Sequence, residues 1–88
     1  MVETIELEFD IEEARLVLLA GTGRIKLRGD NRRVVILNWK GTTHLDYPIE
    51  GFIPDIGSDV IFHWTKKGEL TKDQISMYDL IIEGELWN

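Results

Sequence analysis

Alternation of apolar and polar side chains is the feature that most constrains this fold. In residues 2–11, Ile5, Leu7, Phe9 and Ile11 fall on one side, and Thr4, Glu6, Glu8 and Asp10 on the other. A period of two over this length is typical of a β-strand with one face in water. Residues 60–65, VIFHWT, and the alternating run 76–87 predict two further strands. The chain is therefore expected to be mainly β.

Residues 24–40, RIKLRGDNRRVVILNWK, predict a β-hairpin that turns at Gly29-Asp30-Asn31. With Asp30 and Asn31 at the centre of the turn, Ile25 lies opposite Ile36 and Leu27 lies opposite Val34. These four residues predict a core face. The other face of the hairpin carries Arg24, Lys26, Arg28 and Arg33 together with Val35, Leu37 and Trp39.

Residues 10–20 fit two structures. Asp10 at an N-cap, Glu13 three residues later and Gly21 after the last turn favour a short helix at 11–20. The apolar run that ends at Gly21-Thr22-Gly23 fits a strand entering a tight turn equally well. We expect the strand and keep the helix as the alternative.

The middle of the chain is punctuated by glycine and proline. Residues 42–47 predict a short strand that ends before Pro48. Residues 48–59 predict a structured loop with four buried apolar side chains, Ile49, Phe52, Ile53 and Ile56. Residues 66–69, KKGE, predict a turn.

Six to seven short, mostly antiparallel strands in 88 residues predict a single domain built as a small barrel or sandwich. The segment 53–60, IPDIGSDV, is similar to the start of a strand in many SH3-like and OB-like barrels. The similarity covers eight residues and identifies no family, so an SH3-like or OB-like barrel is one form of the expected barrel or sandwich.

Charge is segregated along a chain whose net charge is −6. Residues 1–13 hold six acids and no base, whereas residues 24–40 hold six of the ten cations and one acid, Asp30. The acidic start does not resemble a signal peptide, and no run of apolar residues is long enough to span a membrane. The chain has no cysteine and therefore no disulfide. We expect a cytoplasmic protein without a membrane partner.

The basic face of the hairpin is the main candidate site. Its cations could follow a phosphate backbone while Trp39 stacks on a base, as in single-strand binders. The same cations could instead face an acidic patch on a partner protein. A third interpretation is ordinary cross-strand pairing with acids of this chain, such as Glu6 and Glu8.

The other reactive residue types give weaker patterns. His44, Asp46, Glu50 and His63 lack the spacing of a metal-binding motif, so we predict no metal and no cofactor. Asp55, Ser58 and His63 lack the sequence context of a hydrolytic triad, so we predict no catalytic residue. Exposed aromatic rings mark interfaces, and the larger candidates are Trp39, Trp64, Tyr78 and Trp87.

Three functions follow from these patterns. The first is a non-enzymatic module that binds a protein partner, as an adaptor, inhibitor or immunity-type protein, with Arg24, Lys26, Arg28, Arg33 and Trp39 as the binding residues. The second is single-stranded nucleic-acid binding through the same residues. The third is assembly into a homo-oligomer, because both ends of the chain read as strands and are candidates for sheet edges.

Overall fold

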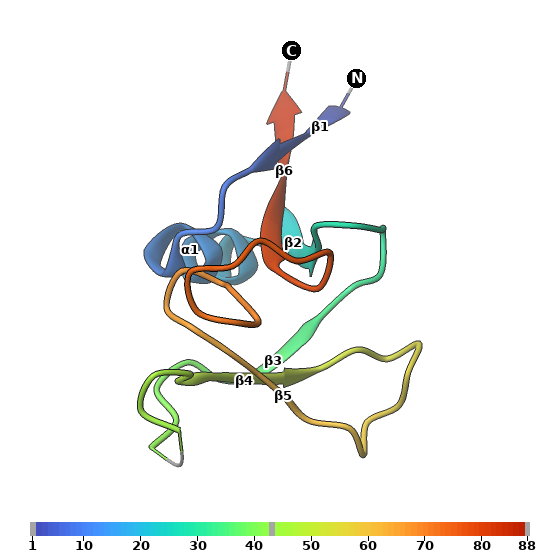
Figure 1. The fold of residues 1–88 in the computed structure, drawn as a ribbon. Coiled ribbons are helices and arrows are strands. Elements are labelled where there is room, and N and C mark those ends of the chain that lie inside the picture. The colour runs from blue at the N-terminus through green and yellow to red at the C-terminus, as the bar shows by residue number, and fades with distance from the viewer. Residues whose placement is uncertain (1, 43, 88) are drawn as a thin grey trace.

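The computed structural model describes residues 2–42 and 44–87, with the side chains of all except Val2, Leu86 and Trp87. Its elements are β1 (Val2–Leu7), α1 (Ile11–Ala20), β2 (Gly23–Leu27), β3 (Val35–Asn38), β4 (Ile49–Phe52), β5 (Phe62–Trp64) and β6 (Leu80–Trp87). The strands form sheet A, in the order β1-β6-β2, and sheet B, in the order β3-β4-β5 (Figure 1). Every ladder is antiparallel. A mainly β fold of six antiparallel strands is therefore confirmed.

The two sheets are not joined into a barrel by any ladder among the described strands. Only an isolated bridge between Lys26 and Arg33 links the end of β2 to the approach to β3. In Figure 1, β1 and β6 extend side by side from one end of the molecule, and β3, β4 and β5 lie at the other. No helix in the described chain is long and apolar enough to cross a membrane.

The predicted hairpin at 24–40 is wrong as a unit. Its first strand, β2, pairs with β6, and its second, β3, pairs with β4. Near the turn, Val34 N donates to Ile25 O at 3.0 Å, which places Ile25 opposite Val34 rather than Ile36. A shift of two residues keeps each side chain on its original face. Ile25, Leu27 and Val34 are therefore still buried, as predicted.

Residues 11–20 form a helix, so the expected strand is wrong and the alternative is confirmed. The Asp10 carboxylate accepts hydrogen bonds from the backbone N–H of Glu12 and of Glu13, both at 3.0 Å. Gly21 ends the helix with a φ of 70°, and Thr22 N donates to Val17 O. Both ends of the helix are thus capped by local interactions, which a strand would not need.

The N-cap gives a testable prediction. Asp10→Ala should lower the free energy of unfolding by about 1 kcal/mol, because two helix N–H groups lose their acceptor. Chemical denaturation followed by far-UV circular dichroism would measure the loss. Asp10→Asn keeps a capping oxygen and should stay close to wild type. Equal losses in the two variants would contradict the capping role.

The middle of the chain differs from the prediction. Among the described residues of the segment 42–47 there is no strand, and β4 lies instead at Ile49–Phe52, inside the predicted loop. Ile49 and Ile53 are fully buried as predicted, but Ile56 is exposed. Gly51 allows close pairing with β3, because a Cβ there would collide with the backbone oxygen of Val35. β5 is confirmed, with bounds narrower than 60–65.

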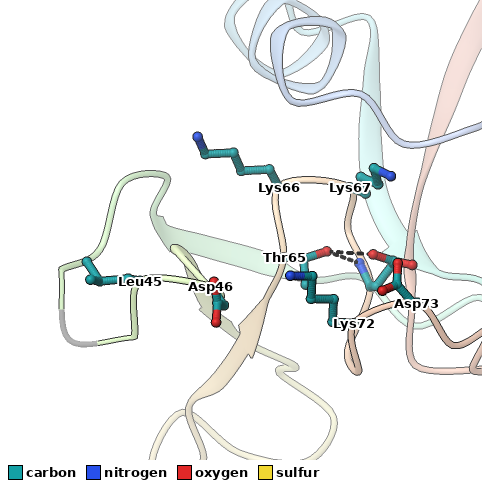
Figure 2. Close-up of a pocket in the computed structure, with 8 residues that line it drawn as sticks. Leu45, Asp46, Thr65, Lys66, Lys67, Lys72 and Asp73 are labelled. Carbon is teal, nitrogen blue, oxygen red and sulfur yellow. Dashed lines mark hydrogen bonds between the residues drawn. The ribbon is translucent and has the colours of Figure 1, made fainter.

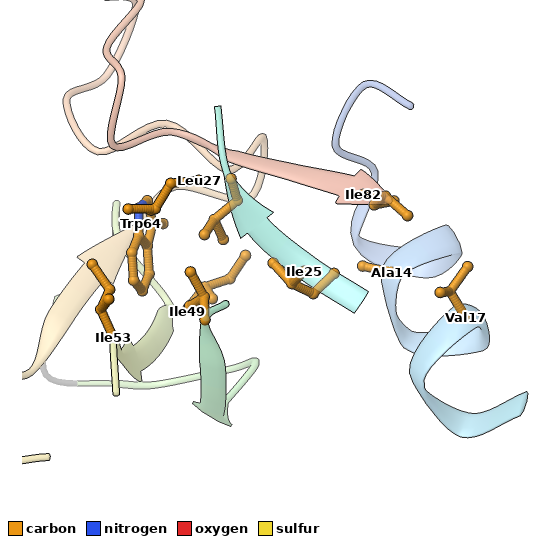
Figure 3. Close-up of a cluster of buried hydrophobic side chains, with 10 residues drawn as sticks. Ala14, Val17, Ile25, Leu27, Ile49, Ile53, Trp64 and Ile82 are labelled. Carbon is orange, nitrogen blue, oxygen red and sulfur yellow. The ribbon is translucent and has the colours of Figure 1, made fainter. Parts of the chain in front are cut away.

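One hydrophobic cluster joins the helix and both sheets. Figure 3 shows Ala14 and Val17 of α1 on one side of Ile25, and Ile49, Ile53 and Trp64 on the other. Trp64 is fully buried, and its indole N–H donates to Tyr78 O at 2.9 Å. Gly23 lets the helix lie close to β2, since a Cβ at this position would come within 2.6 Å of Val17 Cγ1.

Candidate functional site

Two cations of the predicted basic face, Arg24 and Lys26, are bonded to acids of this chain. Lys26 is 5% exposed, and its Nζ lies 2.9 Å from Glu83 Oε2 and 3.7 Å from Glu6 Oε1. It also donates to Asn31 Oδ1 at 3.1 Å. Arg24 Nε donates to the other carboxylate oxygen of Glu83 at 2.8 Å. One carboxylate of β6 therefore serves two cations of β2.

The electrostatics of Glu83 match this arrangement. The hydrogen bond from Lys26 is the largest cause that lowers the pKa of Glu83, and the hydrogen bond from Arg24 adds to it. Burial opposes both, because it disfavours the charged carboxylate. Because its pKa is lowered, the Glu83 carboxyl group is ionised at neutral pH. The charges of Arg24 and Lys26 are thus partly neutralised within the fold.

Arg28 also faces acids of this chain. Its Nη2 donates to Glu8 Oε2 at 3.2 Å, and its Nε lies 3.9 Å from Asp79 Oδ2. The hydrogen bond to Glu8 is the largest cause that raises the pKa of Arg28. Asp79 is buried and accepts from the backbone N–H groups of Leu70 and Ser76. Arg28 therefore lies over a carboxylate that organises the loop before β6.

Arg33 is the one predicted cation outside the ion pairs of the described residues. Its side chain is exposed, next to the bridge with Lys26. Glu6 and Glu8 were anticipated as partners for the basic face, but Glu83 and Asp79 were not. Only the alternation of charged and apolar residues around Glu83 hinted that it would face a neighbouring strand.

Trp39 lies apart from these ion pairs. It follows β3 and, with Glu12 and Arg15 of α1, lines two adjoining open hollows of about 540 and 320 Å³. The larger hollow is completed by Leu16, Leu18 and Leu19. The smaller one is completed by Ile11, Lys40, Gly41, Pro48 and Lys66. We call the two hollows together the Trp39 groove.

The apolar side of the Trp39 groove comes from the outer face of α1. The helix buries Ala14 and Val17 against the core. Leu16 and Leu19 therefore point outward, and they are 60% and 87% exposed. Large apolar side chains grouped on a surface beside an aromatic ring are typical of binding sites.

The charged side of the Trp39 groove is basic. Arg15, Lys40 and Lys66 line it against the single acid Glu12. None of these three cations lies within 4.0 Å of a carboxylate among the residues that the structure describes. The groove thus has a local charge of about +2 on a protein whose net charge is −6.

A further hollow, of about 290 Å³, lies beyond Lys66 and has no such excess of charge. It is lined by Leu45, Thr65, the cations Lys66, Lys67 and Lys72, and the acids Asp46, Glu69 and Asp73. Figure 2 shows Lys66 and Lys67 projecting from the turn after Thr65, which is hydrogen-bonded to Glu69. Three cations face three carboxylates here, so the hollow favours neither sign of charge in a ligand.

The histidines come together without forming a metal site in the described chain. The rings of His44 and His63 meet edge to face, with 4.4 Å between centroids, and His63 Nε2 lies 3.8 Å from Glu50 Oε2. No group of three His, Cys, Asp or Glu side chains among the described residues could hold a metal ion. Asp55 and Ser58 lie in the connection between β4 and β5.

The aromatic candidates differ in how far their side chains are buried. Trp64 is fully buried, whereas Tyr78 and Trp39 both pack against the core and are both partly exposed; of these two, only Trp39 lines the two adjoining hollows. The side chain of Trp87 lies outside the described residues. Trp39 is therefore the described tryptophan with part of its surface open.

Comparisons with protein-family models, with curated proteins and with solved structures found no match.

Proposed function

We propose that this protein is a non-enzymatic binding module that engages a protein partner through the Trp39 groove. The observation that carries the proposal is the meeting of exposed leucines, a partly exposed tryptophan and cations without a carboxylate partner at one place. Interfaces use aromatic and aliphatic anchors in this way, with polar or charged groups around them. The adaptor, inhibitor and immunity-type roles all remain within this proposal.

The Trp39 groove replaces most of the binding face expected from the sequence. Of the predicted binding residues, Arg24, Lys26 and Arg28 hold Glu83, Glu6, Glu8 and Asp79. The charges of these three cations are therefore already partly neutralised, which weakens their attraction for an acidic partner. Only Trp39 carries over into the proposed site.

Single-stranded nucleic-acid binding is the second proposal. Trp39 could stack on a base while Arg15, Lys40 and Lys66 contact phosphates. We place it second because three cations are few for a polyanion and the net charge of −6 opposes the approach of one. If this proposal holds, a labelled single-stranded oligonucleotide should bind at low salt and lose its binding in Lys40→Glu/Lys66→Glu; no binding at low salt would contradict it.

Assembly through sheet edges is the third proposal. β6 lies between β1 and β2, so the expectation of an edge at the C-terminal strand is wrong. β1 is an outer strand of sheet A, with Glu3 and Glu6 along it. Charged side chains on an edge strand disfavour pairing with another copy.

A peptide selection tests the first proposal. A library of random peptides displayed on phage would be selected against the immobilised protein, and clones would be measured against variants. Leu19→Glu should abolish binding, because it places a charge in the apolar part of the groove. Ile75→Glu is the matched control, since Ile75 is 89% exposed and lies outside the groove lining. A library without Leu19-dependent clones would contradict the proposal.

A further inference from the structure

We infer that the Trp39 groove binds an acidic, apolar segment of its partner: a stretch of chain with large apolar side chains flanked by aspartate or glutamate. The inference rests on the proposed function and adds the chemistry of the partner. It follows from the contrast between the cations around β2, which are paired with acids of this chain, and the three cations that gather at the Trp39 groove.

Cations occur in this fold both in ion pairs with the chain's own acids and at the Trp39 groove. Arg24 and Lys26 of β2, and Arg28 just after it, are bonded to carboxylates of β6, of β1 and the segment after it, and of the loop before β6. Those of the groove come from three separate places: Arg15 from α1, Lys40 from the segment after β3, and Lys66 from the segment after β5. The fold brings these three together around one tryptophan and leaves them without a carboxylate among the described residues.

The three cations of the groove act on a bound ligand only over a short range. Charges in water are screened beyond about 8 Å at physiological ionic strength. A segment lying in the groove therefore responds to Arg15, Lys40 and Lys66 more than to the acids elsewhere on the protein. A basic segment would be repelled at this place, whereas carboxylates would find cations that are already free to pair.

The apolar surface of the groove favours a polypeptide segment as the ligand. Leu16, Leu18, Leu19 and Trp39 give anchoring positions along a groove made of two open hollows. An enclosed pocket would favour a small molecule, because such ligands are mostly buried in their sites. An open groove with apolar anchors fits a segment of polypeptide, whose side chains can enter one hollow after another.

The peptide selection also tests this inference, with a second pair of variants. Selected clones should combine apolar residues with an excess of aspartate and glutamate, and their binding should weaken as salt is raised. The double variant Lys40→Glu/Lys66→Glu should weaken binding by roughly tenfold or more, since attraction becomes repulsion at two positions. Lys67→Glu/Lys72→Glu changes net charge equally outside the groove and should weaken it by less than about twofold.

The outcomes separate the inference from the proposed function. Clones that need Leu19 but show no excess of acids, or that ignore Lys40→Glu/Lys66→Glu, overturn the inference and leave the binding module standing. A lack of Leu19-dependent clones overturns both. Leu19-dependent self-association in light scattering would make a second copy the occupant, and oligonucleotide binding that needs Lys40 and Lys66 would make it a nucleic acid. Either result overturns the acidic segment.

Discussion

Trp64→Ala should lower the free energy of unfolding by about 3–5 kcal/mol. Trp64 is fully buried on β5 and lies in the cluster that joins both sheets to α1. Its removal leaves a large cavity and also leaves Tyr78 O without the indole N–H that now donates to it. A domain of this size has a total stability of roughly 4–13 kcal/mol, so the variant would be close to unfolded.

Far-UV circular dichroism should follow this unfolding, because the substitution removes one of the fluorescent tryptophans. Trp64→Phe keeps most of the ring volume and loses the hydrogen bond, so its loss should be smaller, at about 1–3 kcal/mol. A loss below about 1 kcal/mol in Trp64→Ala would show that Trp64 does not fill the core.

Glu83→Gln should lower the free energy of unfolding by about 2–3 kcal/mol at neutral pH. The glutamine side chain is nearly the same size, so the loss reports charge rather than packing. It leaves the buried ammonium of Lys26 with only the distant Glu6 carboxylate and Asn31. Glu6→Gln is the matched control: the Glu6 side chain is 55% exposed, against 18% for Glu83, and its loss should stay below about 1 kcal/mol.

Acid should reduce the difference between wild type and Glu83→Gln. The pKa of Glu83 is lowered in the folded protein, so its contribution is fully present above its unfolded value of 4.5 and is lost as pH falls through the folded value. The difference in the free energy of unfolding between the two proteins should therefore be constant near neutral pH and should shrink progressively as the pH falls below 4.5. A difference that stays constant as the pH falls below 4.5 would mean that the Glu83 charge is not what stabilises the fold.

Period-two alternation was sufficient to predict that β1 and the last strand exist, although β1 ends at Leu7 rather than at Ile11, where the helix begins. Ile5 and Leu7 share a face of β1, and Glu6 lies on the other face, toward Lys26. The last strand begins later than predicted, at Leu80, because Asp79 is used to hold the preceding loop. Apolar and polar side chains alternate in strands whose one face packs on the core and whose other face contacts water or charged side chains.

The helix at 11–20 could not be separated from a strand by apolar pattern. Leu16, Leu18 and Leu19 are exposed, so apolar residues surround the helix and hide its core face of Ala14 and Val17. What distinguishes the helix is the pair of caps, Asp10 and Gly21. The exposed leucines that obscured the helix are the same residues that form the Trp39 groove.

The candidate site depended on contacts between distant parts of the chain. Arg24 and its partner Glu83 are 59 positions apart, and no local pattern fixes that pairing. The local pattern of residues 24–40 predicts a hairpin. In the structure β2 pairs with β6 and β3 pairs with β4, and both partners lie outside this segment. Trp39 was recognised as a candidate, and Lys40 is its neighbour in sequence, but Arg15 and Lys66 meet them only in the folded chain.

The central place of β6 in sheet A has a consequence for how fast the protein folds. β1 and β2 pair with β6 and not with each other, so sheet A cannot form until residues 80–87 have arrived. The β1–β6 ladder also joins segments about as far apart in sequence as this chain allows. Contacts of such long range require closing a large loop first, which places folding in roughly the millisecond to second range. Before this ladder forms, the residues of β1 are unpaired, and the charges of its glutamates disfavour pairing with other chains.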